Sequence, residues 1–236
     1  PYTHSKGAGN LSTLSFFSFL IPTAMYSLYT HINIFVNYIF YYTSLLMREI
    51  KPNSFIFEFN NALKKEDCKS IIGRFEDNKE EHYIGKIGQN ISEDLDIKKS
   101  TDLFISGKEI WKDVDKLFFS ALAKSLHEFK NEIEFFQGPF KDMGYAIQRT
   151  DAGQYYHWHI DGGSHDFSYR QLVAIFYLND LEESQGGTTD FYHQNISITP
   201  EAGKLILFPP FWTHKHRGSE VLFKAKYIAT TWIVFA

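Results

Sequence analysis

The sequence predicts an α+β domain in which supporting N-terminal helices precede a β-rich jelly roll. Its 236 residues contain 44% hydrophobic and 22% charged side chains, which is ordinary for a globular protein. A long segment in the first half carries apolar residues at helical spacing. From residue 143 onward, short runs of β-branched and aromatic residues are separated by glycine- and proline-containing turns. That second pattern is typical of a β-sandwich or barrel, and two opposed sheets make a jelly roll.

The composition also bounds the partners and the compartment. The net charge of −4 gives no electrostatic reason to expect nucleic acid as a partner. Aromatic residues make up 17% of the chain, which suits an aromatic-rich β core. Because Cys68 is the single cysteine, no intrachain disulfide can form. This fits a reducing compartment, and we expect a cytoplasmic protein.

Residues 1–46 differ in composition from the rest of the chain. From Gly7 to Met47 there is no Lys, Arg, Asp or Glu, but proline, histidine and asparagine interrupt the apolar runs. A membrane anchor, which needs about 20 predominantly apolar residues, is one interpretation and would place the protein at a membrane. A signal peptide would depend on Lys6 alone for its basic start. Since the chain opens with Pro1 and charged, well-patterned sequence follows Met47, we expect Met47 to be the true start and 1–46 to be translated upstream sequence.

Residues 47–140 are predicted to form the supporting half of a domain that spans 47–236. In chain order we expect a strand at Phe55–Phe59, a helix at about Lys64–Asp77, a loop with a short strand near Tyr83 at 77–100, and a helix at Lys108–Phe129. The last helix has one apolar stripe, which would pack against a sheet. Cys68 falls on the apolar face of the earlier helix, so we interpret it as a core residue and not as a nucleophile.

Residues 143–236 are predicted to form the jelly roll itself. The strands that we expect are Tyr145–Thr150, Tyr155–His159, Gln171–Leu178, Thr189–Tyr192, Ile196–Ile198, Lys204–Phe208 and Tyr227–Phe235. The breaks between them contain Gly, Pro or Asp at turn positions. Such a fold can hold a metal with ligands that come from separate strands.

Histidines and one aspartate in this half suggest a metal site. In an extended strand, side chains at i and i+2 share a face, so His159 and Asp161 would converge. An imidazole and a carboxylate are two of the three ligands of a non-haem Fe(II) site. Periodicity allows either His214 or His216 as the third ligand, because both would face one side of the same strand. By the same alternation, His157, His159 and His214 form an alternative, cupin-like set.

A family resemblance is carried by six sequence blocks in the last ninety residues. In chain order they are Arg149–Asp161, Arg170–Asp180 with its Tyr-Leu-Asn-Asp end, Gly186–Phe191, Pro200–Phe208, His216–Val221 and Lys226–Tyr227. Together these blocks resemble the prolyl-4-hydroxylase-like branch of the Fe(II)/2-oxoglutarate-dependent dioxygenases. The resemblance implies a double-stranded β-helix, which is the jelly roll of this family, as the core of the domain.

The resemblance also implies the site residues. In the family, a basic residue lies ten positions after the distal histidine, and Lys226 lies ten after His216. We therefore expect His159, Asp161 and His216 to be the catalytic Fe(II) ligands. Lys226 is expected to bind the far carboxylate of 2-oxoglutarate.

One position departs from the family pattern. Thr150 stands where the family usually has a tyrosine that helps to hold the 2-oxoglutarate tail. A threonine hydroxyl is shorter than that phenol. We expect Thr150 and Tyr156 to contact the co-substrate, with Tyr145 as another source of a hydroxyl.

The implied activity is hydroxylation coupled to conversion of 2-oxoglutarate to succinate and CO₂. Fe(II), 2-oxoglutarate and ascorbate, as reductant, are the expected cofactors. A peptide or a small molecule is the expected substrate, with peptidyl proline as the default from the family name. The rival functions are a non-catalytic jelly-roll binding module and a cupin-type metalloprotein that does not use 2-oxoglutarate.

Overall fold

The computed structural model describes residues 47–88 and 92–236. These residues lie within one compact unit. The expectations for residues 1–46 concern residues outside those described, so the domain boundary at residue 47 stays a prediction. Within the described ranges, no helix is both long enough and apolar enough to cross a membrane.

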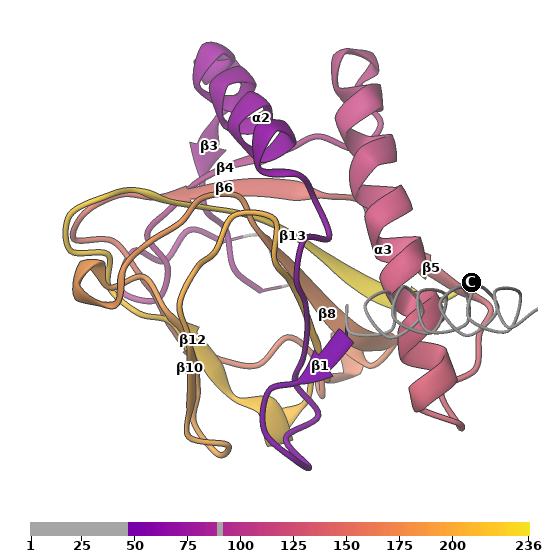
Figure 1. Cartoon of the computed structure of the whole chain (residues 1–236). Coiled ribbons are helices and arrows are strands. Elements are labelled where there is room, and N and C mark those ends of the chain that lie inside the picture. Colours follow the sequence, from indigo (N-terminus) through magenta and orange to yellow (C-terminus); the bar gives the residue numbers. More distant parts are fainter. Residues whose placement is uncertain (1–46, 89–91) are drawn as a thin grey trace, which may run out of the picture. The chain divides into compact units, whose positions relative to one another are not determined.

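The β core consists of two antiparallel sheets (Figure 1). The larger sheet contains β1 (Met47–Glu49), β2 (Phe57–Phe59), β3 (Tyr83–Ile84), β4 (Thr101–Phe104), β5 (Phe140–Asp142), β6 (Ala146–Thr150), β8 (Arg170–Tyr177), β11 (Leu205–Phe208) and β13 (Lys226–Phe235). The smaller sheet contains β7 (Tyr156–His159), β9 (Thr189–Phe191), β10 (Ile196–Ile198) and β12 (His216–Gly218). Their orders are β1-β2-β11-β8-β13-β6-β4-β3, with β5 on β13, and β10-β9-β12-β7. Apart from the consecutive pairs β1-β2, β3-β4 and β9-β10, neighbouring strands are not consecutive in the chain, which confirms the predicted jelly roll.

Two helices cover one face of the larger sheet (Figure 1), as the sequence predicted. They are α2 (Lys65–Asp77) and α3 (Lys112–Glu132). Short 3₁₀ turns lie at Lys79–Glu81, Glu109–Trp111, His165–Phe167, Glu183–Gln185 and Trp212–His214. Cys68 on α2 is fully buried, and this burial raises the pKa of its thiol to about 11. It is therefore a core residue, as predicted.

Alternation along β8 divides the apolar core into two layers. The side chains that pack against the helices are Leu172, Ala174 and Phe176. Those that face the interior of the roll are Val173, Ile175 and Tyr177. Phe118 of α3 meets the first layer, with its ring centroid 5.1 Å from that of Phe176. The helices thus pack on one face of the larger sheet, and the other face is available to line a site.

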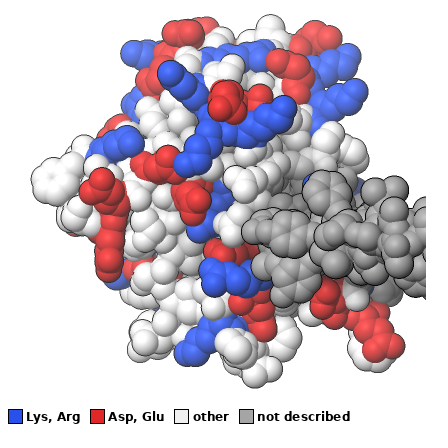
Figure 2. All heavy atoms as spheres, viewed as in Figure 1, with Lys and Arg blue, Asp and Glu red and all other residues white. Residues whose placement is uncertain are grey.

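Charged side chains are interspersed on the face shown in Figure 2, where basic and acidic residues adjoin one another over the two helices. Arg74 of α2 and Asp113 of α3 form one such pair, with Nη1 2.9 Å from Oδ1. An exposed pair of this kind contributes little to stability, so the apolar layer beneath the helices holds them on the sheet.

Candidate metal and co-substrate site

The three predicted metal ligands lie in one cluster. His159 ends β7, Asp161 follows it, and His216 begins β12 directly opposite His159 in the antiparallel pairing. One nitrogen or oxygen from each side chain lies within 4.8 Å of the others. Nε2 of His216 is 3.1 Å from Oδ2 of Asp161, and Nε2 of His159 is 3.9 Å from the same oxygen. The pairing of two short strands thus brings together residues that are distant in sequence.

Backbone carbonyls fix the orientation of both imidazoles. Nδ1 of His159 lies 2.7 Å from the carbonyl oxygen of His157, and Nδ1 of His216 lies 2.9 Å from that of His214. Because a carbonyl only accepts, each Nδ1–H donates, and each Nε2 is left on the side of Asp161. Burial, and then the nearby His216, lowers the pKa of His159 to about 3. His159 is therefore neutral at neutral pH, as a metal ligand must be.

The carboxylate of Asp161 is held by an indole and steadied by a guanidinium. Nε1 of Trp232 donates to Oδ1 at 3.0 Å, and Nη1 of Arg170 donates to the main-chain oxygen of Asp161 at 2.7 Å. The guanidinium carbon of Arg170 lies 3.7 Å from the indole centroid. Burial acts to raise the pKa of Asp161, but hydrogen bonding and charge from His216 outweigh it and leave that pKa well below its usual range. Asp161 is therefore anionic, with Oδ2 toward the imidazoles.

Lys226 is a buried cation in the same pocket. It is 4% exposed, begins β13 and pairs with Thr150 across to β6. Burial lowers the pKa of Lys226 to about 8, although Asp190 acts in the opposite direction. Nζ lies 3.5 Å from Oγ1 of Thr189, and within residues 47–88 and 92–236 no carboxylate comes within 4.0 Å of it. A buried ammonium in this state suits an anionic ligand.

Thr150 and Tyr156 line the pocket that contains Lys226 and the three proposed ligands, and their contact with the co-substrate stays a prediction. The ring of Tyr156 stacks on the imidazole of His159, with centroids 3.6 Å apart and planes at 12°. Burial raises the pKa of the Tyr156 phenol above its usual value. Tyr156 therefore remains a neutral hydroxyl beside the ligand cluster.

Two residues beside Lys226 had no predicted site role. Tyr177 donates its hydroxyl hydrogen to Oγ1 of Thr189 at 2.7 Å, and Nζ of Lys226 lies 5.8 Å from the Tyr177 ring centroid. Both residues lie in blocks of the family resemblance, which was the available signal. Tyr145, in contrast, faces the helices and stacks on Phe118 with centroids 5.2 Å apart. The expectation that Tyr145 supplies a hydroxyl to the pocket is therefore wrong.

The alternative histidines do not join the cluster. Periodicity had predicted that His214 and His216 share a strand. Instead, His214 ends the 3₁₀ turn Trp212–His214, and His216 begins β12. Its Nε2 lies 2.9 Å from the carbonyl oxygen of Ser54. His157 is exposed to solvent. The cupin-like set of His157, His159 and His214 is therefore not assembled.

A tight glycine turn lies beside the stem of Lys226. Gly187 has φ +71°, in the left-handed region that favours glycine. A Cβ at this position would lie 2.8 Å from Cδ1 of Leu181 and 3.5 Å from Cδ of Lys226. A larger residue here would therefore clash with Leu181 and strain the turn, whereas its contact with Lys226 would be an ordinary one.

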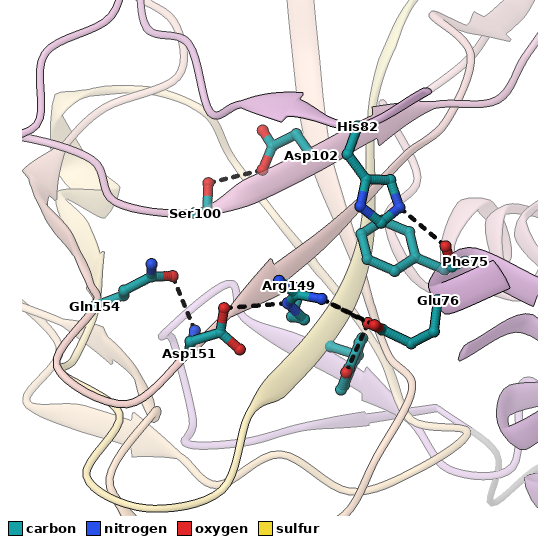
Figure 3. A network of polar contacts seen from close by, with 9 residues as sticks. Phe75, Glu76, His82, Ser100, Asp102, Arg149, Asp151 and Gln154 are labelled. Atoms are coloured by element: carbon teal, nitrogen blue, oxygen red, sulfur yellow. Dashed lines mark hydrogen bonds and ion pairs between the residues drawn. The ribbon is translucent and has the colours of Figure 1, made fainter. Parts of the chain in front are cut away.

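A polar network supports the pocket from the helix side (Figure 3). Arg149 of β6 donates through Nη1 to both carboxylate oxygens of Glu76 in α2, each at 2.9 Å. The hydroxyl of Tyr227 in β13 donates to Oε1 of Glu76 at 2.9 Å. The adjacent residues Thr150 and Lys226 line the pocket instead. Glu76 therefore ties β6 to β13 directly behind the two residues predicted to hold the co-substrate.

The sequence comparison gives a family match. Residues 145–234 match the model of the 2OG-Fe(II) oxygenase superfamily. No curated protein matches the chain significantly. Residues 145–234 therefore resemble a 2OG-Fe(II) oxygenase domain, and this match supports the Fe(II)- and 2-oxoglutarate-dependent dioxygenase that the sequence predicted.

Solved structures of similar fold include three prolyl hydroxylases. The viral collagen prolyl hydroxylase of Paramecium Bursaria Chlorella virus-1, in complex with 2OG, has a TM-score of 0.60 at 20% identity, covering 80% of this chain and 100% of that one. A prolyl hydroxylase from Trichoplax adhaerens, in complex with a hypoxia inducible factor peptide fragment, has a TM-score of 0.66 at 18% identity, covering 77% and 84%. A Pseudomonas putida prolyl-4-hydroxylase has a TM-score of 0.59 at 15% identity, covering 77% and 93%. At these identities the likeness concerns the fold.

Proposed function

We propose that His159, Asp161 and His216 bind Fe(II) in a hydroxylase that acts on a peptide, with proline as the first candidate residue. The observation that carries the proposal is the convergence of the three side chains within 4.8 Å in the pocket that also contains Lys226. Two imidazoles and one carboxylate are the donor set of non-haem Fe(II) oxygenases, which leave further metal positions open. The donor chemistry therefore fits the metal.

We propose further that Lys226 binds the far carboxylate of 2-oxoglutarate. A buried carboxylate needs a charged partner, and the ammonium of Lys226 is buried among hydroxyl groups. Thr150 and Thr189, which line the same pocket, offer hydroxyl donors to that carboxylate. Tyr156, stacked on His159, is proposed to contact the co-substrate near the metal.

Iron and 2-oxoglutarate, when bound, supply the oxidation of a substrate C–H bond by dioxygen, with release of succinate and CO₂. The residues of the chain orient these groups. Trp232 holds the carboxylate of Asp161, Arg170 holds its main-chain oxygen, and the carbonyls of residues 157 and 214 keep both imidazoles in the tautomer that offers Nε2. The apolar side chains of Val173 and Ile175 line the pocket and exclude water from it.

The choice of a peptide substrate is supported by the fold comparison, since one prolyl hydroxylase of similar fold is in complex with a peptide fragment. Ascorbate is proposed as the reductant and the cytoplasm as the location.

The full chain, incubated with Fe(II), ascorbate, 2-oxoglutarate and a panel of proline-containing peptides, tests the substrate proposal. Mass spectrometry should show a peptide that gains one oxygen atom, with succinate in equal amount. Succinate without oxygen incorporation into any peptide would contradict the peptide substrate and point to a small molecule.

A further inference from the structure

Basic side chains gather around the proposed active site. Setting histidines aside, one anionic residue, Asp161, lines the pocket together with five cationic ones, which are Lys86, Lys98, Lys99, Arg217 and Lys226. The chain as a whole carries a net charge of −4. The local charge of the pocket is therefore opposite in sign to that of the molecule.

Three of these five cations already have an anionic partner or a proposed one. Nζ of Lys98 lies 2.6 Å from Oδ2 of Asp102, and both side chains are buried. Nε of Arg217 lies 2.8 Å from Oδ2 of Asp190. Lys226 is assigned to the tail of 2-oxoglutarate. These three cations therefore do not require a further anionic ligand.

Lys86 and Lys99 have aromatic neighbours in place of carboxylates. Nζ of Lys99 lies 5.2 Å from the ring centroid of Tyr155, and Nζ of Lys86 lies 5.7 Å from that of Tyr83. Neither ammonium has a carboxylate within 4.0 Å in the described part of the chain. Lys86 is exposed and Lys99 is half-buried, so both meet the solvent at the edge of the pocket. A cation–π contact restrains an ammonium without neutralising it.

The backbone around Lys99 is fastened to the strand that carries a proposed iron ligand. The amide of Lys99 donates to the carbonyl of Tyr155 at 2.8 Å, and the amide of His157 donates to the carbonyl of Ile97 at 2.7 Å. Both bonds join this segment to the start of β7, which ends at His159. The position of Lys99 is therefore fixed relative to the proposed reaction centre.

We propose, on the basis of the proposed function, that the substrate is a polypeptide segment with carboxylate side chains beside the hydroxylated residue, and that Lys86 and Lys99 bind those carboxylates. Charges of one sign in a cleft focus the electric field and raise the local concentration of an oppositely charged ligand. The two lysines come from separate segments of the chain, so they can contact two separate carboxylates of an extended peptide.

Fluorescence anisotropy with the full chain, loaded with Fe(II) and 2-oxoglutarate under nitrogen, tests this proposal. The probes are a labelled peptide with proline between Asp and Glu residues, and a matched peptide with Asn and Gln in their place. The acidic peptide should bind about tenfold more tightly, as expected for two exposed ion pairs. This preference should be lost in the Lys86→Glu/Lys99→Glu double variant and reduced in Lys86→Gln/Lys99→Gln.

A matched control reverses two exposed lysines of α3, Lys116→Glu/Lys124→Glu, which changes the net charge equally outside the pocket. This control should keep the preference. Equal binding of both peptides, or binding of neither, would overturn the proposal. So would a Lys86→Glu/Lys99→Glu variant that weakens 2-oxoglutarate and peptide binding by the same factor, because the lysines would then serve the co-substrate. Failure of the proposed function would appear separately, as no succinate from the wild-type chain.

Discussion

Replacing Lys226 with methionine removes the ammonium from the pocket and keeps a side chain of similar length. Lys226 is 4% exposed, so the proposed pair with the 2-oxoglutarate tail is shielded from solvent. Loss of one partner from such a buried pair costs about 3 kcal/mol, which is about 150-fold in affinity. We therefore expect the KM for 2-oxoglutarate to rise about 150-fold, with most of kcat retained at saturation.

The same substitution should stabilise the free protein. Burial lowers the pKa of Lys226 from 10.5 to about 8, so below pH 8 the buried ammonium destabilises the fold by about 3 kcal/mol. Methionine removes this penalty, and urea unfolding without 2-oxoglutarate should show a higher midpoint for Lys226→Met. A more stable protein with a weaker co-substrate site is what a binding role predicts.

Succinate formation over a range of 2-oxoglutarate concentrations measures the KM. Lys224→Met is the matched control, because Lys224 is exposed and its Nζ donates to the carbonyl oxygen of Asp180 at 3.0 Å, outside the pocket. The control should keep the wild-type KM. If both variants have the same KM, Lys226 does not bind the co-substrate.

Three other results are expected. Because 2-oxoglutarate needs the charged form of Lys226, the KM for 2-oxoglutarate should be flat below about pH 8 and rise about tenfold per pH unit above that pH. Lys226→Met should abolish this rise. A wild-type KM that stays flat to pH 9 would contradict the prediction. Trp232→Phe removes the donor to Asp161 and should weaken Fe(II) binding about tenfold in a metal titration, whereas unchanged binding would show that the indole is dispensable. Phe118→Ala should cost about 4 kcal/mol in urea unfolding, and Phe119→Ala, whose parent side chain is 55% exposed, should cost less than about 1 kcal/mol; similar losses would argue against the assigned core face of α3.

The sequence predicted those elements whose apolar residues follow a clear period. The stripe of α3 and the alternation of β8 are of this kind, and both elements lie within a few residues of their predicted bounds. Strands β1, β4 and β5 were missed because each has only three or four residues and includes at least one charged one. Helix α3 begins at Lys112 and not at Lys108, because the intervening residues form a 3₁₀ turn with the same apolar spacing.

The site shows where a local pattern loses information. Periodicity could not separate His214 from His216, since the choice depends on a 3₁₀ turn and on a contact with the distant carbonyl of Ser54. Tyr177 lies beside Lys226 because β8 pairs with β13, and no local sequence pattern shows this pairing. The cationic edge at Lys99 likewise arises from tertiary pairing with β7.

The most direct test of the account is succinate production from 2-oxoglutarate by the full chain with Fe(II) and ascorbate, measured beside Asp161→Ala. Enzymes of this class turn over slowly without a prime substrate, so the assay does not depend on knowing it. We predict iron-dependent succinate from the wild type and none from Asp161→Ala, because the variant loses the carboxylate that faces both imidazoles. Equal succinate from iron-loaded wild type and Asp161→Ala would contradict the assignment of the metal site.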